Sequence, residues 1–97
     1  NLVDLTILYN YQFAGGKFVL ANMVLNTPYQ GDENRAATLK ATVESMIADL
    51  DIDNSNAGAF YNLVDLTILY NYQFAGGKFV LGNMVLNTPY QGDEGKA

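Results

Sequence analysis

The sequence contains no cysteine and no histidine, and each absence removes a class of chemistry. Without cysteine the chain has no disulfide framework and no thiol nucleophile. Without histidine it lacks the commonest general base and a principal zinc ligand, and a Ser-His-Asp triad is impossible. The only serines are Ser45, within a predicted helix, and Ser55, in a polar loop. We therefore expect a protein that is not an enzyme and needs no cofactor.

Basic residues are also few, with five Lys and Arg against ten Asp and Glu and a net charge of −5. A phosphate backbone or an anionic membrane surface attracts clustered Lys and Arg, whereas these five are scattered along the chain. No apolar run approaches the roughly 20 residues that span a bilayer. The segment 1–4 lacks the basic start of a signal peptide. We expect a soluble protein that binds neither nucleic acid nor membrane.

What the sequence does contain is one 33-residue segment twice, at 1–33 and 62–94, with a single difference between Ala21 and Gly82. A unique stretch, 34–61, separates the copies, and a short tail, 95–97, follows. Ninety-seven residues suit one domain, so we expect a single domain over 1–97. Either Gly82 permits another backbone to approach closely, or the difference has no consequence.

Each copy has the pattern of a β-hairpin. Apolar side chains occupy alternate positions from Val3 to Phe13, with Leu2 and Leu8 as exceptions, and a Gly-Gly pair precedes a second apolar segment. Alternation with β-branched and aromatic residues is typical of a half-buried strand. A three-residue loop is favoured over a two-residue Gly-Gly turn, because it places apolar residues opposite one another.

The unique stretch predicts a helix over about 33–50 and a loop after it. Asp32 can cap the helix, and apolar residues recur at three- and four-residue spacing from Ala36 to Leu50. The predicted fold class is therefore α+β with the order ββαββ. Two hairpins form an antiparallel four-stranded sheet, and the amphipathic helix packs on one face. Both hairpins occupy the sheet at once, or they compete for one place in it.

The second face of such a sheet would carry too many apolar residues for a wet surface. These candidate interface residues are Leu8, Phe18, Leu20, Val24, Leu69, Phe79, Leu81 and Val85. We therefore expect a non-catalytic structural or self-assembly module that forms a homo-oligomer, with a dimer as the first expectation. The alternative is a module that binds another protein through a sheet edge or this second face.

Near-identity over 33 residues exceeds what a fold requires, because cores tolerate many substitutions of similar volume. Either the duplication is very recent or it was engineered, and the engineered origin is favoured. In that case the chain is a single-chain or domain-swapped form of a smaller oligomer.

One acidic group could bind a metal. Asp49, Asp51 and Asp53 stand at alternate positions, and oxygen ligands at such spacing suit calcium. The match to an EF-hand is poor, because Asn56 stands where Gly is needed and Asn62 where the bidentate Glu should be. A solvated helix end without metal is the favoured interpretation, and a calcium loop is the alternative.

Overall fold

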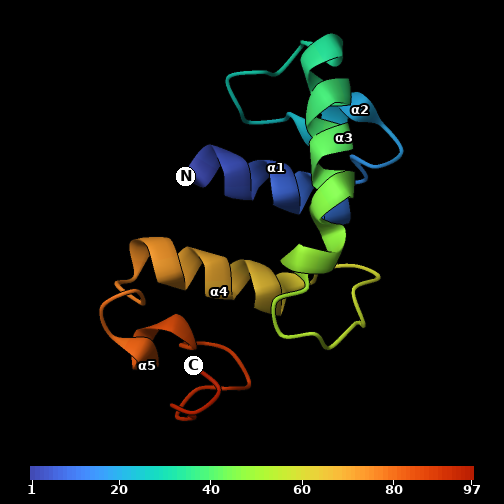
Figure 1. Ribbon diagram of the computed structural model, residues 1–97. Coiled ribbons are helices and arrows are strands. Elements are labelled where there is room, and N and C mark those ends of the chain that lie inside the picture. The colour runs from blue at the N-terminus through green and yellow to red at the C-terminus, as the bar shows by residue number, and fades with distance from the viewer.

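The computed structural model describes residues 1–97 as five helices without a strand (Figure 1). The helices are α1 (Leu2–Phe13), α2 (Leu20–Met23), α3 (Glu33–Leu50), α4 (Leu63–Phe74) and α5 (Leu81–Met84). The predicted α+β fold with a four-stranded sheet is therefore wrong. The tandem duplication is a repeat of a helix, a glycine turn and a short helix, and it is not a β-hairpin repeat.

The start of each copy shows why these segments are helical. The Asn1 side chain accepts hydrogen bonds from the backbone N–H groups of Val3 and Asp4, and the Asp4 carboxylate reaches back to the start of the helix. Asn62 and Asp65 form the same capping box at α4. Apolar residues lie on most sides of these helices, so their spacing also satisfies a strand pattern. The capping residues were the signal that the strand prediction missed.

The Gly-Gly pair ends a helix and does not join two strands. Gly15 adopts a positive φ of 78°, and the N–H of Gly16 donates to the Asn10 carbonyl at 3.0 Å. A Cβ on Gly16 would lie 2.9 Å from the Cα of Met23. The chain therefore needs glycine here, because the short helix α2 returns against the end of α1.

A buried asparagine then holds the returning segment. The Nδ2 atom of Asn10 donates to the carbonyls of Met23 at 3.1 Å and Leu25 at 2.9 Å. Asn71 makes the same two bonds in the second copy, at 3.1 and 2.8 Å. Nearly identical sequences thus form the same local structure twice, α1 with α2 and α4 with α5.

The helix predicted over about 33–50 is confirmed as α3, Glu33–Leu50. Asp32 caps it by accepting a hydrogen bond from the N–H of Arg35 at 2.9 Å, and Ala36 and Val43 are buried. Helix α3 crosses the end of α1 and packs on α2, whereas α1 and α4 lie side by side and run in opposite directions (Figure 1).

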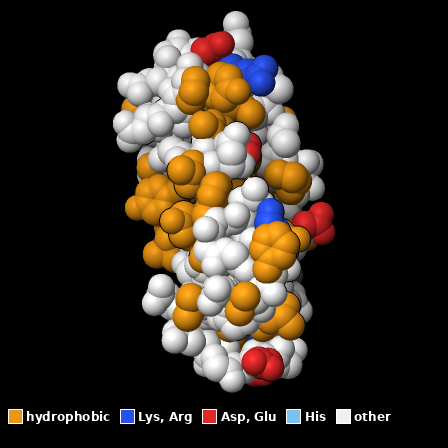
Figure 2. Space-filling model, turned by 90° about the vertical axis from the view of Figure 1, so that its left-hand side faces the viewer, with side chains coloured by type: hydrophobic (Ala, Val, Ile, Leu, Met, Phe, Trp, Pro, Cys, Tyr) orange, Lys and Arg blue, Asp and Glu red, His pale blue; other side chains and the backbone are white.

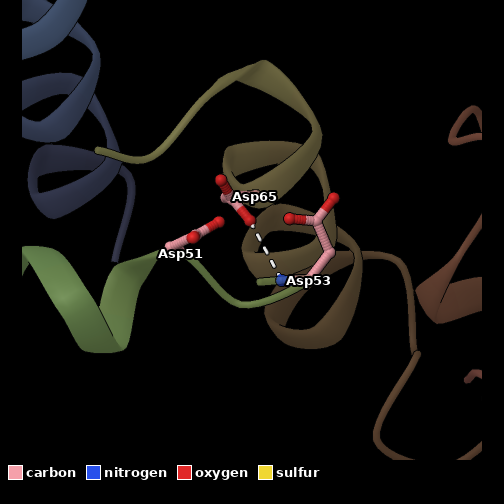
Figure 3. Close-up of side chains that lie close together, drawn as sticks. All are labelled: Asp51, Asp53 and Asp65. Carbon is pink, nitrogen blue, oxygen red and sulfur yellow. Dashed lines mark hydrogen bonds between the residues drawn. The ribbon is translucent and has the colours of Figure 1, made fainter. Parts of the chain in front are cut away.

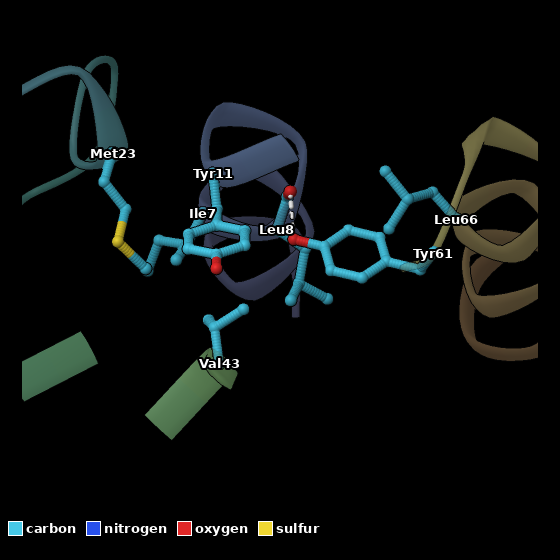
Figure 4. Close-up of a cluster of buried hydrophobic side chains, with 7 residues drawn as sticks. All are labelled: Ile7, Leu8, Tyr11, Met23, Val43, Tyr61 and Leu66. Atoms are coloured by element: carbon cyan, nitrogen blue, oxygen red, sulfur yellow. Dashed lines mark hydrogen bonds between the residues drawn. The ribbon is translucent and has the colours of Figure 1, made fainter. Parts of the chain in front are cut away.

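The core joins both copies and the stretch between them (Figure 4). Its members are Ile7, Leu8, Tyr11, Met23, Val43, Tyr61 and Leu66. Tyr61 is completely buried, its hydroxyl donates to the Leu8 carbonyl at 2.6 Å, and its ring stacks on Tyr11 with centroids 6.4 Å apart. The loop before α4 is thereby fixed to α1.

The single difference between the copies lies in the short helices. A Cβ on Gly82 would meet no atom within 4 Å, and Ala21 is exposed. No close approach of another backbone requires glycine at this position.

Candidate functional site

Three carboxylates meet where α3 ends and α4 begins (Figure 3). Asp51 caps the C-terminus of α3, Asp53 lies in the following loop, and Asp65 lies in the first turn of α4. One oxygen from each carboxylate lies within 4.8 Å of the others. Asp51 and Asp65 are buried, and Asp53 is partly buried. We call these three residues the acidic cluster.

Backbone N–H groups orient the two buried members. Asp65 Oδ2 accepts from the N–H of Asn62 at 2.7 Å, and Oδ1 accepts from the N–H of Asp53 at 3.2 Å. Asp51 Oδ2 accepts from the N–H groups of Asn56 at 3.1 Å and Gly58 at 2.8 Å. The other oxygen of Asp51, Oδ1, is buried and has no hydrogen-bond partner.

Side-chain hydroxyls hold Asp53. Its Oδ1 accepts from the N–H and the hydroxyl of Ser55, at 3.1 and 2.8 Å. Its Oδ2 accepts from the Tyr90 hydroxyl at 2.9 Å, which brings the end of the second copy to the cluster.

The environment shifts the pKa values of Asp53 and Asp65 in opposite directions. Burial raises the pKa of Asp65, and the charge of Asp53 adds to this effect, against the hydrogen bonds that the Asp65 carboxylate accepts. Burial also favours the neutral form of Asp53, but the hydrogen bonds from Ser55 and Tyr90 outweigh it and lower the pKa of Asp53. The hydrogen bond to Asp53 raises the pKa of Tyr90. Asp65 is thus the harder of the two to ionise.

Two of the three acids predicted from the sequence belong to the cluster. Asp51 and Asp53 do, whereas Asp49 lies exposed on α3 and its place is taken by Asp65. Sequence reasoning missed Asp65 because it is 12 residues beyond Asp53. Its position in the capping box is a sequence signal, but Asp4 has the same position and is 71% exposed.

A second feature is a groove of about 470 Å³ between α1 and α4. Its twelve lining residues form six pairs of equivalent positions from the two copies. The pairs are Leu2 with Leu63, Leu5 with Leu66, Thr6 with Thr67, Tyr9 with Tyr70, Asn10 with Asn71, and Asn26 with Asn87. None of them is charged at neutral pH. We call this feature the inter-repeat groove.

The predicted interface residues differ widely in exposure. Leu8, Val24 and Val85 are buried, Leu20 and Leu69 are partly buried, and Phe18, Phe79 and Leu81 are exposed. Phe18 and Phe79 are the extremes, at 83% and 84% exposed. Figure 2, which views the side where α1 begins and α4 ends, shows hydrophobic side chains in several patches and few charges.

None of the five helices combines the length and the apolar character that crossing a bilayer requires. The chain matches no protein-family model, no curated protein and no solved structure.

Proposed function

We propose that this chain is a non-catalytic structural module that forms a homodimer through the inter-repeat groove. The observation that carries the proposal is the composition of the groove, whose walls are six pairs of equivalent residues without a charge. The fold has neither a sheet edge nor a second sheet face, so neither of these predicted surfaces can form the interface.

The arrangement of α1 and α4 supports a symmetric partner. Two identical helices that run in opposite directions and present the same residues to one groove are related by an approximate two-fold axis (Figure 1). An isologous dimer requires the same patch on both subunits. The exposed residues on the walls of the groove offer such a patch. The antiparallel pairing of α1 with α4 is also compatible with a single-chain form of a smaller dimer, although the two copies differ in burial, with Tyr11 4% and Tyr72 45% exposed.

The absence of charge in the groove removes one obstacle to a second copy as the partner. Each chain carries a net charge of −5, so two copies repel one another wherever acidic side chains face each other. The groove lacks Asp, Glu, Lys and Arg, and its burial would strand no unpaired charge.

The groove also offers apolar surface to cover. Leu2 and Leu63 are 56% and 55% exposed, and Tyr9 and Tyr70 are 49% and 48% exposed. Covering apolar surface contributes about 25 cal/mol per Å², and a standard interface buries roughly 800 Å² on each partner. Tyrosine is enriched at interfaces because its ring is apolar and its hydroxyl can remain hydrated.

The test is the oligomeric state of a matched pair of double variants. Tyr9→Glu with Tyr70→Glu places two carboxylates in the groove, whereas Phe18→Glu with Phe79→Glu places two carboxylates on exposed turns outside it. We expect the parent chain and the Phe variant to sediment as dimers and the Tyr variant as a monomer.

Far-UV circular dichroism verifies that both variants keep their helices. A parent chain that stays monomeric at high concentration would refute the proposal. Dimers that survive in the Tyr variant and dissociate in the Phe variant would move the interface to the exposed phenylalanines, and would favour a surface that can also bind another protein.

A further inference from the structure

We infer that the acidic cluster of Asp51, Asp53 and Asp65 binds a calcium ion that ties the end of α3 to the start of α4. None of the three residues lines the inter-repeat groove, so the inference is independent of the proposed dimer.

The spacing of the oxygens fits a single ion. Calcium binds oxygen at about 2.3–2.6 Å, so two ligands of one ion lie no more than about 5 Å apart. One oxygen from each of the three carboxylates satisfies this limit, since all lie within 4.8 Å of one another. The ligands come from a helix end, a loop and the first turn of the next helix, and an ion would therefore join three segments.

One buried oxygen of the acidic cluster has no hydrogen-bond partner. Asp51 is only 4% exposed, and its Oδ1 atom receives no hydrogen bond. Its carboxylate points toward that of Asp65 in Figure 3. A buried anionic oxygen without a partner is costly, and a buried charge is normally paired or bound to a metal. A cation within the cluster would supply the partner that Asp51 lacks.

The charge around the cluster favours a cation for the same reason. None of the three carboxylates forms a salt bridge with Lys or Arg. Asp51 also lies at the C-terminus of α3, where the helix dipole is negative and repels a carboxylate. The hydrogen bonds described above hold the side chains in place, but they do not neutralise three negative charges.

The donor set selects the kind of ion. All three side chains offer hard carboxylate oxygens, and neither thiolate nor imidazole exists in this chain, so a zinc site of the usual Cys and His type is impossible. Magnesium demands near-octahedral geometry at about 2.0–2.1 Å, whereas calcium accepts irregular sets of carboxylates, carbonyls and water. An irregular set of carboxylates from a helix end, a loop and a helix start suits calcium.

The test titrates calcium chloride into the full chain after removal of metals with EDTA. Isothermal titration calorimetry gives the affinity, and thermal unfolding gives the stabilisation. At a free calcium concentration about 100-fold above the dissociation constant, we expect the midpoint to rise by about 10 °C. Magnesium chloride at equal concentration should give a smaller rise.

Matched variants locate the site. Asp51→Asn and Asp53→Asn should each abolish most of the heat of binding and most of the rise in midpoint. Asp4→Asn removes the same charge from the repeat-equivalent of Asp65, at an exposed position, and should bind calcium as the parent does. If Asp51→Asn does not fold, Asp53→Asn at its partly exposed position decides the question.

Terbium luminescence shows where in the chain the ion binds. Because the Tyr90 hydroxyl lies 2.9 Å from Asp53 Oδ2, terbium bound in the cluster should be sensitised by tyrosine, and Tyr90→Phe should reduce that emission severalfold. Calcium should displace the terbium.

An unchanged midpoint with no heat of binding would overturn the inference. An equal loss of binding in Asp4→Asn and Asp53→Asn would also overturn it, because it would show diffuse attraction to a negative chain.

Discussion

Replacing Met23 and Met84 with alanine, one at a time, isolates the contribution of tertiary packing to the stability of this protein. The two methionines are equivalent positions of the repeat, and each carbonyl accepts a hydrogen bond of 3.1 Å from the buried asparagine of its own copy. Their local environments therefore match. Met23 is completely buried in the core, whereas Met84 is only partly buried. The same substitution thus samples two tertiary environments.

The expected cost follows from burial. Truncation of a fully buried methionine to alanine costs about 2–5 kcal/mol, because the side chain loses its transfer free energy and leaves a cavity. Met84 already contacts solvent, so a cost of about 1 kcal/mol is expected for it. For a chain of this size each kcal/mol corresponds to a shift in Tm of roughly 4–8 °C. Met23→Ala should therefore melt about 10 °C below Met84→Ala.

Urea unfolding followed by far-UV circular dichroism measures the two free energies. The comparison is valid where the unfolding free energy of both variants has the same dependence on urea concentration. Amide hydrogen exchange adds a regional readout, in which Met23→Ala should weaken protection throughout α1, α3 and α4. Equal losses of stability in the two variants would refute the conclusion that Met23, and not Met84, belongs to the core.

Three further outcomes are expected. Burial, with a smaller contribution from Tyr11, raises the pKa of Tyr61 above its ordinary value of 10.0. The stability that this shift contributes is therefore fully present below about pH 10 and is lost as the pH rises further, because the unfolded chain ionises first. Tyr61→Phe should cost about 0.5–1.5 kcal/mol at neutral pH and reduce the loss of stability at alkaline pH. Urea unfolding across the alkaline range measures this loss, and an equal decrease with pH in the parent and the variant would contradict the prediction. Gly82→Ala should stabilise the fold by up to about 1 kcal/mol and raise the melting midpoint, since the added Cβ meets open space. A lower midpoint would show a hidden contact. Gly16→Ala should cost about 1–3 kcal/mol because its Cβ would clash with Met23, and a parent-like melting temperature would contradict this.

Helix α3 could be predicted from the sequence, and α1 could not be predicted by hydrophobic periodicity. Asp32 caps α3, and its apolar side chains keep to one stripe, so a single period fits them. In α1 apolar residues surround the helix, and the alternation from Val3 to Phe13 is also compatible with a strand. The capping box at Asn1 and Asp4 distinguishes the two structures, but it carries less weight than a run of twelve mostly apolar residues.

The candidate metal site was predictable only in part. Asp51 and Asp53 are close in sequence, and their spacing alone suggested oxygen ligands. Asp65 joins them because the loop after α3 folds back over the start of α4, where Tyr61 anchors it in the core. Only the path of that loop in three dimensions decides that Asp65, and not Asp49, completes the group.

The repeat separates what sequence determines from what tertiary structure decides. The sequence by itself determines local structure, because the capping asparagines, the Gly-Gly turns and the Asn10 and Asn71 hydrogen bonds are the same in both copies. Burial is decided only by the tertiary structure. Asp4 is exposed and Asp65 is fully buried, although both stand at the same position of the repeat. Backbone hydrogen bonds and caps depend on neighbours along the chain, whereas desolvation depends on which distant segments cover a residue.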